Sequence, residues 1–557
     1  MDTFETSRKR KPNQPNKSER QNDDRKTENE ENFSGKIDED VTRVKRILPS
    51  EDVPVYAFET KSGTRCAIIY TDGMVNKQLL GDLAVRPLSA YDKKQIDEER
   101  VRESVLFPEI KQTKTPDAAA KEILDGNALL LVDTITCGVI IGTKSVPTRA
   151  VTEPQTSVVV KGPREGFIED VKTNVTLLRK RLKTGDLRIE TVFSGKRSNT
   201  TIALCYLQSV ADPRVLQTVK ERLSATQTDI VADSSYLVKL LAERRHTLFK
   251  EVGTTEKPDV LAAKIAEGRV GIIADGSPIA LSVPYTLSED FQSAEDYFIS
   301  PFAATIFRCL RFFAAAVALL LPALYVSSQL FSLQLIPLNL TLTIAGSTRG
   351  LPLSPSLEMF LVLLVLEILK EASIRMPKYV GLALSVVGAL VLGDTAVSAG
   401  FVSTPAIIVV AFSGICLYTV PDFVETGSVL RWIFLIVAGS VGPFGIVLLC
   451  AFLLYYLITA DAFGAPPLAP FAPFIKHDQK DALMKADLFD LPTRPRLFRT
   501  KNRRRLKCAE QAPNSGDADK SGNTGSGGNG EDAAVRNTGG DVTTEAQKYT
   551  PKKEKKR

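Results

Sequence analysis

The residues best suited to chemistry lie in VVVKGPREGFIEDVKTN, residues 158–174, where a β-branched triplet leads through a Gly-Pro-Arg-Glu-Gly turn into a helical pattern. A phosphate-binding loop has this order, with four residues between its glycines and Lys-Ser/Thr behind them. Here three residues separate Gly162 from Gly166, Phe167 follows, and Pro163 lacks a backbone N–H donor. The spacing therefore argues against a nucleotide site.

Other signatures of catalysis or cofactor binding are weak. A second glycine pattern, GSGGNG at Gly525–Gly530, lies in a Gly/Ser/Asn-rich tail without the strand and helix that a dinucleotide site requires. The 7 cysteines form no Cys-x-x-Cys pair and are read as small apolar core residues, and the 2 histidines cannot complete a zinc site with them. The sequence predicts no enzyme, no catalytic or metal site and no cofactor. The net charge of +6 gives no reason to expect a nucleic-acid partner.

Composition divides the 557-residue chain into unlike parts. Residues 1–35 and 509–557 are charged or rich in Gly and Ser, with little to bury, so both tails are expected to be disordered. No apolar signal-peptide core occurs in the first 60 residues, which predicts that the N-terminal part stays in the cytoplasm.

The part of the chain between the first tail and residue 300 repeats itself. LFPEIKQTKTPDAAAKEILDG (106–126) aligns without gaps with LFKEVGTTEKPDVLAAKIAEG (248–268), and VTRVKRILPSEDV (41–53) aligns with VTLLRKRLKTGDL (175–187). We therefore predict a cytoplasmic α/β region made of two duplicated subdomains, over 36–150 and 151–300. Residues 36–150 and 166–299 should superpose.

Each copy is expected to contain an opening helix, a strand pair, a middle helix, a Pro-Asp turn, a helix ending at glycine and a closing hairpin. Apolar residues at helical spacing mark the opening helices; they are Ile37, Val41, Val44 and Leu48 in the first copy and Ile168, Val171, Val175 and Leu178 in the second. A candidate inter-domain signature lies between the copies and consists of Gly162, Pro163, Arg164, Glu165, Gly166 and Phe167. A rigid turn and a functional contact, such as an Arg164–Glu165 pair across the junction, are both open interpretations of it.

Residues 301–460 predict an α-helical, multi-pass transmembrane domain of about five to six spans. Apolar runs cover 312–331, 357–369, 379–400, 403–420 and 430–460, whereas 331–346 is short and polar enough to be re-entrant or interfacial. The last run is long for one helix and short for two. Arg308 and Arg311 precede the first run, which places the N-terminal domains in the cytoplasm. Counting the last run once gives five spans and a C-terminal segment (461–508) outside, whereas the strongly basic 493–507 favours the cytoplasmic side. An even count, through 331–346 or a broken last helix, would satisfy the basic segment.

Charged and small residues at membrane depth are candidates for gating or helix coupling. EILKEASIRMP (367–377) places Glu367, Lys370 and Glu371 on one helical face, where they can pair locally or solvate a helix end. A bare carboxylate inside an apolar run costs roughly 2.5 to 3.5 kcal/mol on insertion scales, so Asp394 should face other helices, a partner subunit or water. Gly381, Ser385 and Gly388 would let helices approach closely. The candidates are Glu367, Glu371, Arg375, Pro377, Gly388 and Asp394.

Several longer motifs, taken in order, resemble the A subunit of the GerA-type spore germination receptors. They are EPQTSVVVKGPREGFIEDVKTNVTLLRKRL (153–182), YLQSVADPRVLQTVKERL (206–223), DGSPIALSVPYTLSEDFQSAEDYF (275–298), LPALYVS (321–327), EILKEASIRMP (367–377) and PPLAPFAPF (466–474). The resemblance extends from about residue 36 to about residue 500. KADLFDLPTRP (485–495) departs from the Arg and Trp residues often seen there, so no family role is carried over to that segment.

The resemblance implies a non-catalytic protein of the inner spore membrane that works with a transporter-like, nutrient-binding B subunit and a lipoprotein C subunit. It also implies a homo-oligomer, surrounded by membrane lipids, with an ion pore that opens when nutrient binds. Two alternatives remain from other classes. A secondary transporter would carry inverted repeats in its membrane half, where the sequence shows none. A passive membrane scaffold requires no particular motif, so the sequence does not test it.

Overall fold

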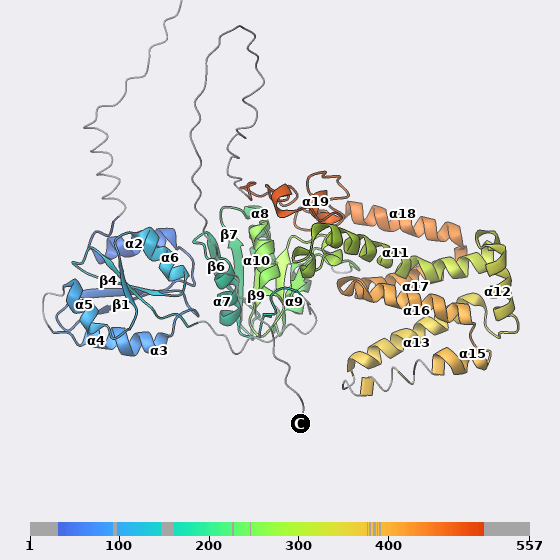
Figure 1. Cartoon of the computed structure of the whole chain (residues 1–557), viewed down its shortest axis with the longest axis horizontal. Coiled ribbons are helices and arrows are strands. Elements are labelled where there is room, and N and C mark those ends of the chain that lie inside the picture. Colours follow the sequence, from blue (N-terminus) through green and yellow to red (C-terminus); the bar gives the residue numbers. More distant parts are fainter. Residues whose placement is uncertain are drawn as a thin grey trace, which may run out of the picture. The chain divides into compact units, whose positions relative to one another are not determined.

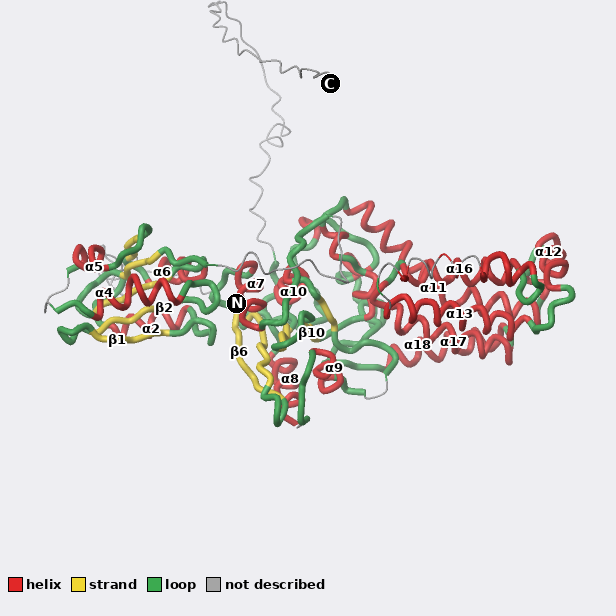
Figure 2. Tube along the Cα trace, turned by 90° about the horizontal axis from the view of Figure 1, so that it is seen from below, coloured by secondary structure: helices red, strands yellow, loops and turns green. Residues whose placement is uncertain are grey.

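The computed structural model describes residues 32–92, 97–145, 161–225, 228–244, 247–375, 377, 380–381, 386, 388 and 391–505. These residues form two five-stranded antiparallel sheets with helices on both faces, followed by a group of longer helices (Figure 1). Every described strand precedes the first long helix in the sequence. Figure 2 shows the strands apart from the group of helices labelled α11 to α18. The predicted tail over 509–557, most of the tail over 1–35 and part of 379–400 lie outside the described residues.

The first sheet has the strand order β1-β2-β4-β5-β3. Its strands are β1 (Val55–Glu59), β2 (Arg65–Ile69), β3 (Ile110–Thr113), β4 (Ala128–Val132) and β5 (Gly138–Ile141). Alternate residues of β2 and β4 point to opposite faces, and both sets are apolar, so both faces can be covered. Helices α2 (Ile37–Ile47) and α6 (Pro116–Leu124) pack on one face, and α3 (Lys77–Leu80), η1 (Gly81–Val85), α4 (Arg86–Ser89) and α5 (Glu98–Ser104) on the other.

The second sheet has the order β6-β7-β9-β10-β8, which is the order of the first sheet with each strand number raised by five. Its strands are β6 (Leu187–Ser194), β7 (Thr200–Leu207), β8 (Gly253–Thr255), β9 (Val270–Ala274) and β10 (Ala280–Val283). Helices α7 (Val171–Arg181) and α10 (Pro258–Ala266) cover one face, and α8 (Pro213–Ala225) and α9 (Ser234–Leu241) cover the other. This topology agrees with the predicted repeat, although the edge strands β3 and β8 were not anticipated.

The proline and glycine residues predicted to bound the repeated helix do so in both copies, in α6 and in α10. Pro116 and Pro258 each begin a helix, where a missing N–H costs nothing. Gly126 (φ 99°) and Gly268 (φ 109°) end those helices with a positive φ that glycine adopts without steric cost. One detail of the prediction is wrong: α7 begins at Val171, so Ile168 precedes the helix instead of lying on its apolar stripe.

The helical part begins after two short turns, η2 (Leu287–Phe291) and η3 (Ala294–Tyr297). It consists of α11 (Pro301–Phe331), η4 (Leu333–Leu335), α12 (Leu338–Thr348), α13 (Pro355–Arg375), η5 (Val391–Thr395), α15 (Ala396–Ser398), α16 (Thr404–Tyr418), η6 (Pro421–Phe423), α17 (Val424–Val441) and α18 (Pro443–Thr459). Pro301–Phe331 and Pro421–Val441 are long and apolar enough to cross a membrane, and Thr404–Tyr418 and Pro443–Thr459 are shorter apolar helices.

The apolar run over 430–460 is broken into two helices. The break occurs at Gly442, whose φ of 75° and ψ of −153° leave the helical region, and Pro443 starts the next helix. A Cβ built on Gly442 would lie 2.8 Å from Cγ of Phe331 at the end of α11, so the break also permits a close helix contact. The chain reverses there.

The segment after α18 returns to the second sheet. Ala462 and Phe463 are buried in the core between that sheet and helices α8 and α9. Further on, past α19 (Gln479–Ala482) and η7 (Leu488–Asp490), Arg494 Nε donates to the carbonyl of Ala266 over 2.7 Å. The C-terminal segment is therefore part of the folded unit.

Candidate functional site

The signature Gly162–Phe167 packs on the second sheet and reaches the start of the helical part. Phe167 is buried in the core between α7 and α10, and its N–H donates to the carbonyl of Glu256 over 2.8 Å. Gly162 has a φ of 120°, and a Cβ built on it would lie 2.7 Å from a ring carbon of Phe298, three residues before α11. Glycine is required there by both conformation and space.

Within this signature, Glu165 pairs with α7. Its two carboxylate oxygens lie 2.8 Å from Lys180 Nζ and 2.8 Å from Arg181 Nη2. The hydrogen bond from Lys180, opposed by partial burial and aided by the charge of Arg181, holds the pKa of Glu165 below its usual value. These partners belong to the second subdomain, so the pairing of Glu165 is made within that subdomain.

Several contacts join the two α/β subdomains, among them the hydrogen bond from Ile189 N–H to Ser50 Oγ (3.0 Å) and a Lys183–Asp125 ion pair. The most buried of them, made by Arg179, was not anticipated from the sequence. Arg179 of α7 donates to Asp52 through Nη2 (2.7 Å) and Nε (3.0 Å), and through Nη2 to Ser50 Oγ (3.3 Å). Only 1% of the Arg179 side chain is exposed. The available signal was its position four residues after Val175, on the apolar face of α7, where an arginine needs a buried partner.

A cluster of four charged residues holds the first turns of α11; we call it the α11 anchor, formed by Asp296, Arg308, Arg311 and Asp481. Asp296 accepts from Arg308 Nε (2.9 Å) and from both Nη atoms of Arg311 (2.9 and 2.7 Å). Burial alone would raise the pKa of Asp296, but the hydrogen bonds from Arg311 and Arg308 outweigh it and leave that pKa below its usual value. Asp296 is therefore a buried carboxylate held in its charged form.

Asp481 brings the C-terminal segment into the α11 anchor. Its carboxylate lies 3.2 Å from Arg308 Nη1, which is fully buried, and 3.2 Å from the hydroxyl of Tyr297. The backbone N–H of Lys485 also donates to Thr305 Oγ1 of α11 over 3.0 Å. The anchor thus ties η3, α11 and the returning C-terminal segment together by charge-assisted contacts.

A second polar cluster lies beside the anchor, in the turn η2 that leads to α11. Glu289 contacts Arg269 Nη1 at 2.5 Å and Lys264 Nζ at 3.0 Å. Burial pushes the pKa of Glu289 up, yet the charges of Arg269 and Lys264 outweigh it and keep that pKa below its usual value. Its neighbour Asp290 has the opposite balance, because burial exceeds the effect of Lys250 and raises the pKa of Asp290 to about 7.

Among the helices, a buried arginine organises a polar network. Arg431 of α17 is 2% exposed and lies 2.6 Å from Glu367 of α13. Its Nη1 donates to Ser413 Oγ of α16 over 3.2 Å, and that hydroxyl donates to the carbonyl of Ala318 in α11 over 2.8 Å. Glu367 also pairs with Lys370 at 2.9 Å. We call Arg431, Glu367, Lys370 and Ser413 the Arg431 network.

The other residues proposed for gating lie outside this network. Glu371 and Arg375 form a 2.6 Å pair that is 60% and 77% exposed, at the end of α13. Asp394, in η5, is exposed in the single chain, so it is not buried against the described helices. Water and a partner subunit remain as the predicted neighbours of its carboxylate. A Cβ on Gly388 would lie 3.2 Å from Leu369 of α13, so this glycine allows a close contact within the chain.

Two more of the residues singled out in the sequence, Pro377 and Ser385, follow α13. Pro377 is exposed, and its carbonyl accepts from the N–H groups of Val380 (2.9 Å) and Gly381 (3.1 Å), as at the start of a helix. Ser385 lies outside the described residues. Within the described residues, no group of three or more His, Cys, Asp and Glu could hold a metal ion.

The model of a family described as "Bacillus/Clostridium GerA spore germination protein" matches residues 42–497. This chain belongs to the GerA family. Among its relatives, spore germination protein KA of Bacillus subtilis (strain 168) is 33% identical over 458 residues, which are 81% of this chain and 84% of that protein. Spore germination protein GerLA of Bacillus cereus is 32% identical over 449 residues, 79% of this chain and 91% of the relative.

The chain is also similar to a membrane protein and to one solved structure. The uncharacterized membrane protein YfkQ of Bacillus subtilis (strain 168) is 32% identical over 451 residues, 80% of this chain and 88% of that protein. The crystal structure of the N-terminal domain of the A subunit of the Bacillus megaterium spore germinant receptor GerK3 covers 45% of this chain and 96% of its own, with 24% identity and a TM-score of 0.37.

The GerA match includes the segment whose sequence departs from the pattern expected near the C-terminus. KADLFDLPTRP, 485–495, begins with Lys485, which donates to α11 and pairs with Asp481 at 3.3 Å. Near its other end, Arg494 binds the end of α10. The segment therefore contacts both α11 and the second subdomain.

Proposed function

We propose that this chain is the A subunit of a nutrient germinant receptor and converts nutrient sensing into spore germination. In this proposal it forms an oligomeric, ligand-gated ion channel with a nutrient-binding B subunit. Membership of the GerA family supports the germination role. The Arg431 network is the observation on which the gating part rests, because a protein that signals without chemistry must switch between conformations of different stability.

The Arg431 network has the properties that a switch between helices requires. One buried guanidinium joins α13, α16 and, through Ser413, α11, so a shift of any of these helices changes the partners of the others. Its Nε has no hydrogen-bond partner among the described residues, and an unsatisfied buried donor can be satisfied in another arrangement. Helix packing that has two alternative arrangements converts a small shift into a discrete change, and in this proposal the Arg431 network is such a packing.

The α11 anchor gives the path by which the soluble part would bias the helices. Asp296 and Asp481 hold Arg308 in the third turn of α11, and the signature glycine Gly162 touches Phe298 just before that helix. Movement of the second subdomain would therefore be passed to α11 through buried charged contacts. This part of the proposal places the candidate signature at the soluble end of the path.

The proposed location is the inner membrane of the spore, with several crossings and the N-terminal region in the cytoplasm. The segment after α18 packs on the second subdomain, which precedes α11, and this packing supports placing both ends of the helical part on one side of the membrane. In this proposal the number of crossings is even. Arg308 and Arg311 at the start of α11 favour the cytoplasmic side for these ends.

The proposed partners are a transporter-like B subunit, a lipoprotein C subunit and further copies of this chain. Exposed apolar side chains on α11, α16 and α18, such as Phe313, Ile415 and Phe444, provide surface for lipids or for neighbouring subunits. The exposed carboxylate of Asp394 would then face a neighbouring copy or the water of a pore.

Deletion of the gene followed by germination scoring against amino acids, sugars and salts tests the receptor role. Loss of the response to one class of nutrient is expected. Three separate substitutions, Glu371→Gln, Asp394→Asn and Gly388→Leu, then test the region 357–400 as the gate, with protein levels in the spore membrane checked and cation release measured after nutrient. Release without nutrient in any variant supports the gate, and wild-type release in all three contradicts it.

The same strains distinguish the alternatives. A secondary transporter would accumulate labelled nutrient without releasing cations, and a passive scaffold would leave both unchanged while lowering the levels of its partners. For the proposed channel, cation release must change in the substituted strains while the B subunit is present at its normal level.

A further inference from the structure

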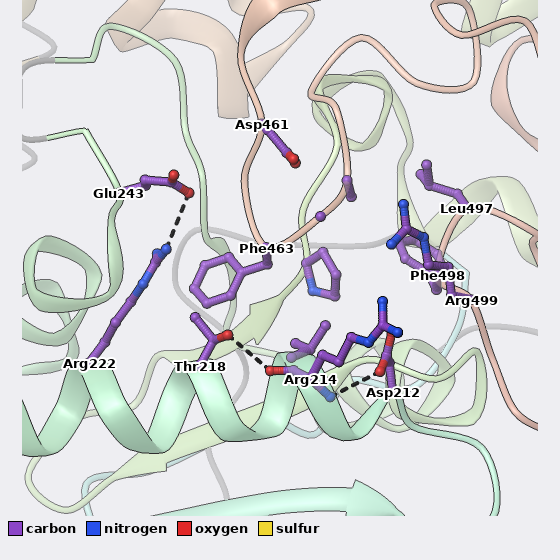
Figure 3. A pocket seen from close by; sticks show the side chains of 14 residues that line it. Asp212, Arg214, Thr218, Arg222, Glu243, Asp461, Phe463, Leu497, Phe498 and Arg499 are labelled. Atoms are coloured by element: carbon purple, nitrogen blue, oxygen red, sulfur yellow. Dashed lines mark hydrogen bonds and ion pairs between the residues drawn. The ribbon is translucent and has the colours of Figure 1, made fainter.

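A cavity of about 280 Å³ lies apart from the α11 anchor and the Arg431 network (Figure 3). Its walls come from α8, from the turn that follows α18 and from residues 497–499 of the C-terminal segment. Six charged side chains line it: Asp212, Arg214, Arg222, Glu243, Asp461 and Arg499. Glu243, after α9, and Pro284, after β10, complete its walls, so the cavity joins five segments of the chain.

Two of the acidic groups in this cavity are already engaged. Glu243 lies 3.2 Å from Arg222, which also donates to the carbonyl of Leu241 and covers the ring of Phe463 at 4.5 Å. Asp212 accepts from the backbone N–H of Arg214 over 2.9 Å and so caps the start of α8. Asp461 is exposed and has no partner among the described residues.

Unlike Arg222, Arg214 and Arg499 do not pair with an acidic side chain of the cavity. Among the described residues, no carboxylate lies within ion-pair distance of either guanidinium group, and neither makes a side-chain hydrogen bond. Figure 3 shows both groups on the same side of the cavity, away from the Arg222–Glu243 pair. Two unpaired guanidiniums beside one cavity are suited to an oxyanion, which their planar donor forks bind in pairs.

The place of the cavity in the fold narrows the kind of anion. The apolar helix α18 ends at Thr459, two residues before Asp461, so the cavity lies at the end of a helix of the proposed membrane domain. Its volume exceeds that of a bare ion and is near the lower range of small-molecule sites. Basic pockets beside membrane helices bind phosphate head groups.

We propose that this cavity binds a phosphate group, held between Arg214 and Arg499, from a phospholipid head group or from a free phosphate ester. Such a ligand would bridge α8 and the C-terminal segment next to Phe463, which is buried in the core with Val215 and Val219. The bound phosphate would fasten the end of α18 to the second subdomain. The site is independent of the proposed channel activity.

The test uses the full chain purified in a neutral detergent and measures binding by isothermal titration. The probes are inorganic phosphate, glycerol 3-phosphate and a short-chain phosphatidylglycerol. Arg214→Gln and Arg499→Gln should each weaken binding about tenfold or more, since each removes a charge-assisted contact. Lys239→Gln on α9 and Lys501→Gln are charge-matched controls; both side chains are exposed and outside the cavity lining, and they should leave binding unchanged.

Asp461→Asn is expected to raise the affinity for phosphate, whereas the arginine substitutions lower it. It removes a negative charge from the cavity lining, so phosphate should bind more tightly, a result that misfolding cannot produce. Binding of all three probes would assign the site to free phosphate esters as well, and binding of the lipid alone would assign it to head groups. The proposal would be overturned if none of the three probes bound saturably. It would also be overturned if Lys239→Gln and Lys501→Gln weakened binding as much as the arginine substitutions do.

Discussion

Arg431 Nη2 lies 2.6 Å from Glu367 Oε1 and joins α17 to α13 across 64 residues of sequence. The guanidinium is 2% exposed, and the carboxylate also pairs with Lys370. A charge at this depth is costly unless it is paired and hydrogen-bonded. The pair therefore fixes which face of α13 meets α17.

Arg431→Met is expected to lower the free energy of unfolding by about 1 to 3 kcal/mol, because the partly buried carboxylate of Glu367 then keeps only Lys370 as a charged partner. Glu367→Met should have a similar effect. The double substitution should cost clearly less than the sum of the two, since it leaves neither charge unpaired. Unfolding of the full chain in detergent measures all three. Arg375→Met, which breaks the exposed pair with Glu371, is the matched control and should cost less than about 1 kcal/mol.

The contact between the two α/β subdomains gives a second prediction. Arg179→Met should destabilise their association, because Asp52 then loses the two donors it has at 2.7 and 3.0 Å. Limited proteolysis between the subdomains should become faster in this variant. Asp38→Asn removes an ion pair with Arg65 in which both side chains are at least half exposed, and it should leave the cleavage rate unchanged. Equal rates in wild type and Arg179→Met would contradict the assignment.

Gly162 tests the connection between the signature and α11. Gly162→Ala combines a strained φ of 120° with a contact of 2.7 Å to the Phe298 ring, so it should slow germination and destabilise the region before α11. Phe298→Ala added to Gly162→Ala should relieve the contact and restore part of the loss. Gly63→Ala is the control for strain alone, because its φ is 82° and no atom lies within 4 Å. If Phe298→Ala gives no recovery, the signature does not act through this contact.

Asp290 predicts a pH dependence of stability. Its pKa of about 7 in the folded chain, against a usual 3.8, means that the folded state binds this proton more tightly than the unfolded state. The proton on Asp290 therefore adds its full contribution to the free energy of unfolding below about pH 4. That contribution is lost as the pH rises to about 7, by up to about 1.4 kcal/mol per pH unit. Burial is the main cause; Lys250 and the hydroxyl of Tyr285 oppose it.

Asp290→Asn removes that titration and keeps an acceptor for Tyr285, so its stability should fall less between pH 4 and 7 than that of the wild type. The difference between the two unfolding curves is the quantity to compare. Glu267 is partly buried, which raises its pKa, and it contributes the same slope to both proteins. Parallel curves for wild type and Asp290→Asn would contradict the raised pKa.

Much of the architecture was predictable because its signals are local. Pro116 and Pro258 start helices, Gly126 and Gly268 end them, and apolar residues at helical spacing mark α2 and α7. The gapless repeat therefore predicted the order of the main elements in both copies. Short edge strands such as β3 escaped prediction, because a strand paired on one side carries little pattern of its own.

For the site, the sequence by itself determined which residues carry charge where charge is costly, and Glu367 was among them. Only the tertiary structure decided their partners: Arg431 for Glu367, Asp52 for Arg179 and Asp481 for Arg308, the last across 173 residues. It also decided that the run 430–460 turns back at Gly442. The reason is that side-chain periodicity is set within one element, whereas an ion pair depends on how distant elements pack against one another.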